Sequence, residues 1–163
     1  MPNLGLMNNE STTFLREAIR LAEDNVRNGG GPFGAIVVKN GEIIGRGANR
    51  VTDNNDPTAH AEVMAIRDAC RHLGHFQLEG CELYTSCEPC PMCLGAIYWA
   101  RPDKVYYAAT KEDAARAGFD DAFIYRELAM LPPERSLPMN QGCEAEKLLP
   151  FQAWEGNEAR VEY

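Results

Sequence analysis

Three cysteines stand three residues apart in the stretch TSCEPCPMCLGAI, which covers residues 85–97. They are Cys87, Cys90 and Cys93, and the whole chain contains six cysteines. Thiolates are ligands of zinc and of iron–sulfur clusters, so this spacing indicates a metal site. A bacterial four-iron cluster uses C-x2-C-x2-C-x3-C-P, and its fourth ligand would fall on Ile97, which cannot bind iron. Zinc fits better, with an imidazole supplied from elsewhere in the chain.

The chain has three histidines that could supply this nitrogen ligand. His72 and His75 straddle the end of a predicted helix, and we interpret them as polar residues that face solvent. His60 differs, because it stands at a predicted helix start in TAHAEVMAI, two residues before Glu62. A carboxylate so close to a metal ligand can reach a metal-bound water and transfer its protons. We therefore predict that His60 is a ligand and that Glu62 shuttles protons.

The cysteines lie at the start of a second predicted helix. Pro91 suits the first turn of a helix, so Cys90 and Cys93 fall on neighbouring positions of that turn. The positive end of the helix dipole stabilises thiolates there. Cys87 comes before this helix and before Pro89, and we interpret it as a small buried thiol that lines the pocket.

One imidazole and two thiolates leave the fourth tetrahedral position of zinc to water. This is the pattern of a catalytic rather than a structural zinc site. The charges of Zn²⁺ and two thiolates cancel, so hydroxide can bind without a large negative excess. Zinc lowers the pKa of its bound water to about 7, which provides a nucleophile for hydrolysis. A structural zinc, with Glu62 on the surface, is the alternative.

The elements that must position these residues alternate between helices and strands. Ser11–Thr13 offer caps for the first helix, Gly74 should end the second, and the tail 148–163 has no clear period. The expected elements are a helix over 14–26, two strands around an Asn40-Gly41 turn, a helix over 59–74, a strand over 81–86, a helix over 91–100, a strand over 104–109, a short helix with a Thr110–Asp113 capping box, a helix over 121–130 and a loop over 131–138. This order predicts a layered α/β domain with a mixed sheet.

Composition narrows the class of protein. The 163 residues are 45% apolar and 25% charged, as expected of one globular domain with a real core. The net charge of −8 is spread evenly without a Lys/Arg run, which argues against a nucleic-acid partner. The first 17 residues show no secretory signal, and the longest apolar stretch, CLGAIYWA, is too short to span a bilayer. We expect a cytoplasmic protein whose thiols stay reduced and available to metal.

The two parts of the metal pattern carry a resemblance. His60-Ala61-Glu62 followed by PCPMC at 89–93 matches the H-x-E…P-C-x-x-C signature of zinc deaminases. The chain resembles the cytidine deaminase superfamily over almost its full length, and within it the small bacterial guanine deaminases. The stretches that carry this resemblance are GGGPFGAIVVKNGEIIGRGANRV, NDPTAHAEVMAI, LYTSCEPCPMCLGAIYWARP, AATKEDAARAGFDD, PFQAW and the terminal Tyr.

The resemblance implies a three-layer α/β/α fold around a five-stranded mixed sheet, with residues 1–163 forming a single zinc-dependent deaminase domain. It also implies a homodimer in which the C-terminal segment can be exchanged between subunits. The implied reaction is hydrolytic deamination of guanine to xanthine and ammonia in purine catabolism, with a zinc-activated water attacking C2. Glu62 would take a proton from the water, protonate a ring nitrogen and deliver a proton to the departing amine.

The resemblance also assigns residues to the binding of the base. Asn49 and the backbone N–H of Ala61 would hydrogen-bond to it, and Asp121 would contact its polar edge and take part in proton transfer. The side chains implied to line its faces are Phe33, Trp99 and the ring of His60. The C-terminal segment ending at Tyr163 would close over the pocket. The tail 148–163 also carries Phe151 and Trp154, and because burying such large rings is favourable, we predict that they anchor this lid on its own subunit or on a partner.

From the residues alone, several of these roles have a second interpretation. Phe33 and Trp99 suit core positions equally well, and an asparagine such as Asn49 at the end of a strand often only forms a turn. Asp121 and its neighbour Asp120 could cap the next helix.

Three other functions stay open at this stage. Another deaminase of the superfamily would act on guanosine, cytosine or tRNA adenosine; the charge of −8 argues against tRNA, and a nucleoside needs room for its ribose. A non-catalytic zinc domain would have no use for Glu62. An electron carrier would be visibly brown and would need Cys70, Cys81 or Cys143 to complete an iron–sulfur cluster.

Overall fold

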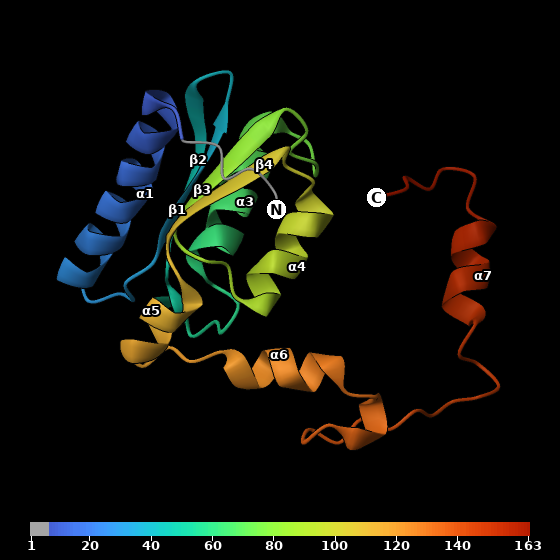
Figure 1. Ribbon diagram of the computed structural model, residues 1–163. Coiled ribbons are helices and arrows are strands. Elements are labelled where there is room, and N and C mark those ends of the chain that lie inside the picture. Colours follow the sequence, from blue (N-terminus) through green and yellow to red (C-terminus); the bar gives the residue numbers. More distant parts are fainter. Residues whose placement is uncertain (1–6) are drawn as a thin grey trace. The chain divides into compact units, whose positions relative to one another are not determined.

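The computed structural model describes residues 7–163, and the chain divides into two compact units. The first unit runs through Asp121 and the second covers Ala122–Tyr163. In the first unit, helix α1 covers one face of a sheet, and helices α3 and α4 cover the other (Figure 1). This is the predicted layered α/β arrangement. The expectation of no secretory signal rests partly on residues 1–6, which lie outside the described residues.

The first unit carries nine of the helices and strands. In chain order they are α1 (Asn9–Arg27), β1 (Gly34–Lys39), β2 (Glu42–Ala48), α2 (Val51–Asn54), α3 (Ala61–Leu73), β3 (Cys81–Cys87), α4 (Pro91–Ala100), β4 (Lys104–Ala109) and α5 (Lys111–Arg116). The strand order is β2-β1-β3-β4, with β1 antiparallel to both neighbours and β3 parallel to β4. The mixed sheet predicted from the sequence is therefore confirmed.

The expectation of five strands is wrong for the described residues, whose sheet has four. After β4 the chain forms α5, α6 (Ala122–Ala129), the 3-10 helix η1 (Pro132–Glu134) and α7 (Leu149–Glu155). Thr110 and Asp113 form the predicted capping box, which starts α5 directly after β4. Further on, four prolines interrupt the chain, and proline cannot donate to a strand ladder.

Helix α1 begins earlier than the sequence suggested. Its N-cap is Asn8, whose Oδ1 accepts a hydrogen bond from the backbone N–H of Ser11 at 2.7 Å. Ser11 is thus a buried residue of the first turn and not a cap. The buried face repeats at steps of three and four residues, through Ser11, Leu15, Ala18, Ala22 and Asn25. This face packs against β1 and β3.

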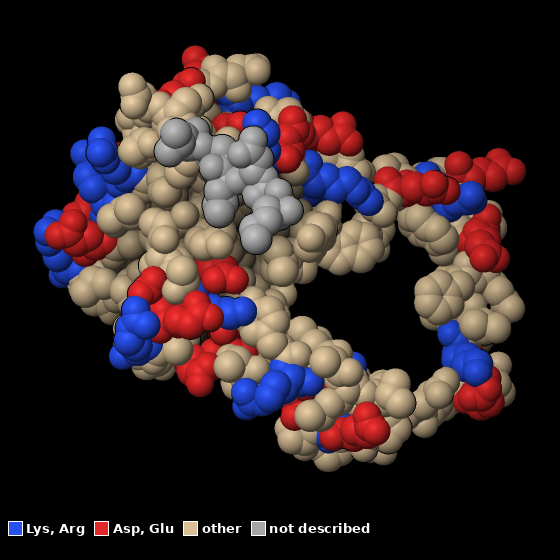
Figure 2. Space-filling model, viewed as in Figure 1, with Lys and Arg blue, Asp and Glu red and all other residues tan. Residues whose placement is uncertain are grey.

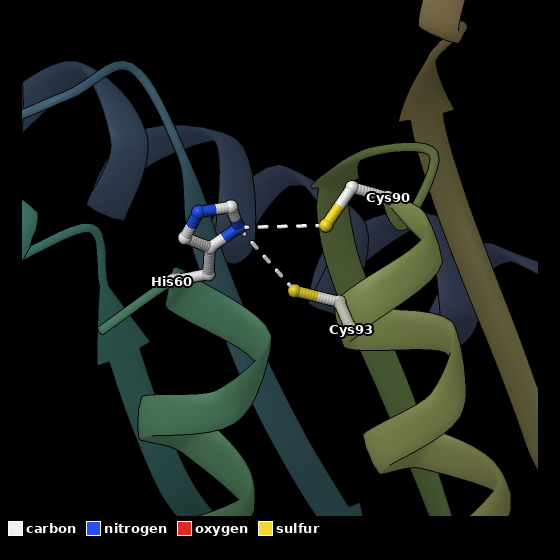
Figure 3. A group of neighbouring side chains, drawn as sticks. All are labelled: His60, Cys90 and Cys93. Atoms are coloured by element: carbon white, nitrogen blue, oxygen red, sulfur yellow. Dashed lines mark hydrogen bonds between the residues drawn. The ribbon is translucent and has the colours of Figure 1, made fainter. Parts of the chain in front are cut away.

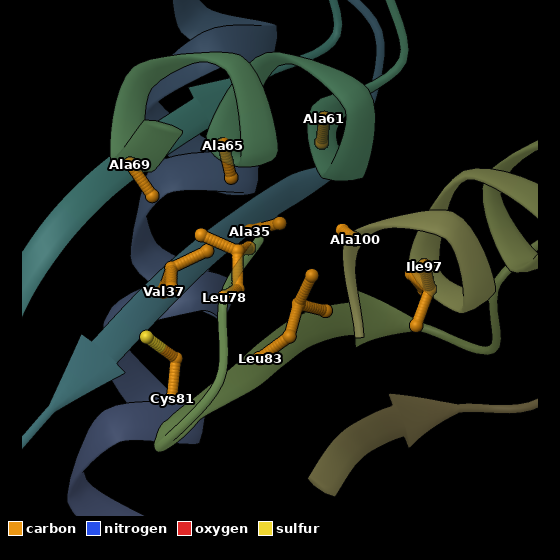
Figure 4. Packing of buried hydrophobic residues seen from close by; sticks show 10 residues of the cluster. All are labelled: Ala35, Val37, Ala61, Ala65, Ala69, Leu78, Cys81, Leu83, Ile97 and Ala100. Atoms are coloured by element: carbon orange, nitrogen blue, oxygen red, sulfur yellow. The ribbon is translucent and has the colours of Figure 1, made fainter. Parts of the chain in front are cut away.

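Two features of the hairpin bring α3 close to the sheet. Asn40 and Gly41 both have positive φ, 51° and 78°, as the predicted two-residue turn requires. On β2, a Cβ at Gly47 would lie 2.1 Å from the carbonyl oxygen of Ala61, so only glycine permits this approach. The small residues Ala61, Ala65 and Ala69 complete the contact within the core cluster of Figure 4. The start of α3 is therefore held against the sheet.

The second unit contains α6, η1 and α7. Helix α7 was not predicted, because its seven residues begin Leu-Pro and bury no side chain. Trp154 and Tyr163 meet edge to face with ring centroids 6.3 Å apart. Many apolar side chains of this unit are exposed, among them Phe123, Leu128, Leu131, Leu137, Leu149 and Phe151. Across residues 7–163, every helix is too short or too polar to cross a lipid bilayer.

Candidate active site

Two helix starts bring three metal-binding side chains together. His60 is the N-cap of α3, and Cys90 is the N-cap of α4, with Cys93 in the following turn. The Nδ1 of His60 lies 3.5 Å from the Sγ of Cys90 and 3.5 Å from the Sγ of Cys93 (Figure 3). All the possible ligand atoms of this group lie within 4.8 Å of one another. The structure thus assembles the three residues that the spacing singled out.

The donor set and its spacing fit zinc. Zinc bonds sulfur at about 2.3 Å and imidazole nitrogen at about 2.0 Å, which at tetrahedral angles separates the nitrogen and sulfur by about 3.5–3.6 Å. The measured separations of 3.5 Å match this value for both cysteines. Three protein ligands would leave one tetrahedral position of zinc for a further ligand, and two of the three, His60 and Cys90, line a pocket.

The protonation of the group also suits a cation. Hydrogen bonding by Cys93, together with that by His60, lowers the pKa of the Cys90 thiol to about 4, so Cys90 is a thiolate. The hydrogen bond to Cys90, followed by burial, raises the pKa of the Cys93 thiol. The hydrogen bond that the His60 ring donates to the Cys90 thiolate raises the pKa of His60. A divalent cation competes with these protons, so binding releases them.

Glu62 lies beside the cysteines and is almost completely buried, with 6% of its surface exposed. Its Oε1 accepts a hydrogen bond from Thr85 Oγ1 at 3.2 Å, and its Oε2 accepts one from the Cys93 thiol at 3.4 Å. Burial raises the pKa of the Glu62 carboxyl. A carboxyl with a raised pKa, held in place at a pocket wall, is suited to accept and return protons.

A cavity of about 480 Å³ opens beside these groups, a size suited to a small organic molecule. Six of the site residues expected from the sequence line it: Phe33, Asn49, His60, Glu62, Cys90 and Asp121. Burial raises the pKa of the Asp121 carboxyl, and the charge of Cys90 adds to this shift. Cys87 also lines the cavity, and burial raises the pKa of its thiol to about 11, so it stays protonated.

Three other expected residues are placed differently. Ala61 is fully buried in the first turn of α3. Trp99 is on α4 with 64% of its surface exposed and does not line the cavity. Tyr163 belongs to the second unit, where it contacts Trp154.

Sequence reasoning missed Phe119 as a wall of the cavity. Its ring meets that of Phe33 edge to face, with centroids 5.0 Å apart and planes at 87°. The sequence did offer one indication of this role, because Phe119 lies in the segment AGFDD, two residues before the expected site residue Asp121. Further residues of the lining that were not anticipated are Gly29, Gly30, Gly31, Val51, Thr52, Glu88, Lys111 and Ala114.

Comparison with known proteins agrees with this geometry. Residues 8–109 match the family model described as the cytidine and deoxycytidylate deaminase zinc-binding region. The match covers more than half of the chain, and the chain therefore belongs to this family of zinc-dependent deaminases. Zinc is the cofactor of the protein, and the fold is that of the family.

The chain is similar to individual members of this family to different extents. The chain is 60% identical to the guanine deaminase of Bacillus subtilis over 158 residues, which is 96% of this chain and 100% of that one. The crystal structure of a Bacillus subtilis guanine deaminase superimposes with a TM-score of 0.92, covering 96% of this chain and 99% of the other. A tRNA-specific adenosine deaminase of Aquifex aeolicus is 50% identical over 96 residues, 59% of this chain and 64% of the relative.

Proposed function

We propose that this zinc-dependent aminohydrolase converts guanine and water into xanthine and ammonia, in purine catabolism. One observation carries the proposal: the similarity to the guanine deaminase of Bacillus subtilis extends over both whole chains. The similarity to the tRNA-specific adenosine deaminase of Aquifex aeolicus covers only 59% of this chain. The part of the chain that is similar to both enzymes accounts for the metal chemistry. The rest of the chain is similar only to the guanine deaminase of these two, and it therefore favours guanine as the substrate.

His60, Cys90 and Cys93 hold the zinc in this proposal. Their 3.5 Å separations and the thiolate at Cys90 support the assignment. When bound, zinc acidifies a water molecule so that it can attack carbon near neutral pH. Two of the three ligands, His60 and Cys90, stand at helix starts and also line the cavity that receives the base.

Glu62 moves the protons. Its carboxylate accepts one proton from the attacking water as the oxygen bonds to C2 of guanine, and it passes this proton to a ring nitrogen. The second proton of the water goes to the exocyclic nitrogen, again through Glu62. The C2–N bond then breaks, ammonia leaves, and the ring keeps the oxygen as xanthine. The buried position of Glu62, fixed by Thr85, supports this role.

The remaining expected residues bind the base. Asn49 and the backbone N–H of Ala61 form hydrogen bonds with the base. Asp121 contacts the polar edge of the base and assists proton transfer. Phe33 and His60 provide flat surfaces for the ring, since both line the cavity. Trp99 and Tyr163 do not line this cavity, and their proposed place beside the base rests on the resemblance alone.

Residues 1–163 act together in this proposal as a single deaminase domain, with 148–163 as its lid. The enzyme works in the cytoplasm as a homodimer, with the C-terminal segment exchanged between subunits and with neither nucleic acid nor membrane as partner. The exposed apolar side chains of the second unit support association, because such groups are normally covered. Light scattering of the purified protein tests the dimer, and a monomer at micromolar concentration contradicts it.

The alternative is another deaminase of the family, acting on guanosine, cytosine or tRNA adenosine. Figure 2 shows Lys and Arg interspersed with Asp and Glu over the visible face, without the basic stripe that a tRNA enzyme needs. A substrate panel decides: ammonia release is measured with guanine, guanosine, cytosine, adenine, aminotriazines and a tRNA anticodon stem. If a substrate other than guanine has the largest kcat/KM, the proposal is rejected.

A further inference from the structure

Asn25 is a buried polar residue that connects two walls of the cavity without lining it. It lies on the inner face of α1 with 4% of its surface exposed. Its Nδ2 donates to the backbone carbonyl of Gly31 at 2.8 Å and to the backbone carbonyl of Asn49 at 2.8 Å. Asn49 is 24 residues away in the sequence, so this side chain joins the end of β2 to the glycine-rich loop after α1.

The hydrogen bonds continue from these two carbonyls into the cavity wall. The carbonyl of Gly31 also accepts from the backbone N–H of Phe33 at 2.9 Å, and the carbonyl of Phe33 accepts from the N–H of Asn49 at 3.1 Å. The Oδ1 of Asn49 in turn accepts from the N–H of Val51 at 3.3 Å. Asn25 thus closes a ring of hydrogen bonds that fixes the backbone on which Phe33 and Asn49 stand.

The glycines of the loop allow this close contact. A Cβ at Gly30 would lie 2.4 Å from the Nδ2 of Asn25, and a Cβ at Gly31 would lie 2.9 Å from the Cγ of Asn49. The N–H of Gly30 donates to the backbone carbonyl of Asn25 at 2.8 Å. The loop is therefore shaped around the Asn25 amide, and a side chain on it would displace that amide.

The Asn25 amide serves folding and geometry together. Its two donated hydrogen bonds satisfy buried backbone carbonyls, so an apolar residue in its place would leave the carbonyl of Asn49 without this donor. The same two hydrogen bonds fix the glycine-rich loop relative to the end of β2.

We propose that Asn25 is a positioning residue for the base: its two donated hydrogen bonds hold Asn49, and with it the adjoining wall at Phe33, in the geometry that binds the substrate. The inference rests on the proposed function, because the contact between Asn49 and the base is itself part of that proposal. A displacement of a binding group by about 1 Å can lower turnover a hundredfold, so loss of this anchor should be measurable.

The test is Asn25→Leu, which keeps the number and branching of the side-chain heavy atoms and removes both donated hydrogen bonds. We expect one zinc per chain as in the wild type, and a kcat/KM for guanine about tenfold to a hundredfold lower, mostly through KM. The matched control is Asn28→Leu. Asn28 is the exposed C-cap residue of the same helix, its side chain donates to the backbone carbonyl of Asp24, and its replacement should leave kcat/KM unchanged.

A double-mutant cycle separates positioning from a general structural role. If Asn25 acts through Asn49, Asn25→Leu should change kcat/KM by less than about threefold in an Asn49→Ala background. Equal losses in both backgrounds would show a structural role and overturn the inference. So would full activity of Asn25→Leu, or an Asn49→Ala variant as active as the wild type.

Two further outcomes are distinguishable. If Asn25→Leu does not fold, Gly30→Ala takes its place in the cycle, because its methyl group displaces the Asn25 amide from the loop side. The same additivity criterion then supports or overturns the inference. If the wild type releases no ammonia from guanine, the proposed function fails by itself, and the cycle is measured with the base that the substrate panel identifies.

Discussion

Three cysteines share one short segment, yet their surroundings give them different chemistry. Cys90 and Cys93 face His60, whereas the Cys87 thiol donates to the carbonyl of Thr110 at 3.6 Å and is held protonated by burial. We predict that Cys90→Ala and Cys93→Ala lose zinc, activity and stability, because metal binding is coupled to folding. Cys87→Ala should retain about one zinc per chain. Metal analysis of the three variants decides, and zinc loss confined to Cys87→Ala would refute the ligand assignment.

Glu62 is the residue on which the proton transfers depend. Glu62→Gln keeps the size of the side chain and the hydrogen bond from Thr85 but cannot accept or release a proton. We predict a folded protein with normal zinc content whose kcat falls about 10²–10⁴-fold. Steady-state kinetics beside metal analysis provide the measurement. Turnover within a few-fold of the wild type would mean that another group carries the protons.

Phe119 is expected to contribute to binding through its edge-to-face contact with Phe33. Such aromatic contacts are worth about 0.5–1.5 kcal/mol, so Phe119→Ala should lower kcat/KM for guanine about threefold to tenfold, through KM. Phe76→Ala is the control, because Phe76 is also partly exposed but stacks on His75 and does not line the cavity. Identical kinetics of the two variants would exclude Phe119 from the binding site.

The ligands could be predicted because ligand type and spacing are local properties of the chain. His60, Cys90 and Cys93 are the right donors at helix starts, and Pro91 marks one of these starts. Asn25 and Phe119 could not be found in this way. Their significance lies in contacts with Asn49 and Phe33, which are distant in sequence, and neither residue type is unusual where it stands.

At the scale of elements, local signals located the helix ends well. Pro91 and the αL residue Arg101 bound α4 at the predicted residues 91–100, and Gly74, with φ of 63°, ends α3. Two predictions about elements were wrong, one about the N-cap of α1 and one about the number of strands. Asn8 took the cap that Ser11 was expected to provide, and the fifth strand was inferred from resemblance without a β pattern after β4.

The contact between β2 and α3 positions the catalytic end of α3, and it depends on Gly47. We predict that Gly47→Ala destabilises the protein by about 1–3 kcal/mol, because its methyl group would collide with the backbone at Ala61. Zinc affinity should fall as well, since His60 precedes Ala61. The comparison variant is Gly95→Ala within α4, where a Cβ meets nothing within 4 Å and should be neutral or stabilising. Denaturant unfolding with zinc titration tests both, and equal stabilities would contradict this view of the contact.

At the scale of the whole molecule, the two units contribute different properties. The described part of the first unit holds the ligands, the proton-transferring group and the cavity. The helices of the second unit bury no side chain, and the unit exposes large apolar side chains such as Phe151 at 64%. Burying such a ring is worth about 1.5–3 kcal/mol, so these groups favour docking of the segment onto its own subunit or a partner.

The last prediction concerns the proposed lid, residues 148–163. The ring of Tyr163 contacts that of Trp154, so the chain end packs against α7. Deleting residues 159–163 should lower guanine turnover at least about tenfold, because a closed lid excludes water and orders the bound base. Zinc content and thermal stability should stay unchanged, and Tyr163→Phe, which keeps the ring, should retain more activity than the deletion. If the truncated enzyme deaminates guanine as fast as the intact one, the segment is no lid, and the selection of a bare base over a nucleoside must come from the cavity itself.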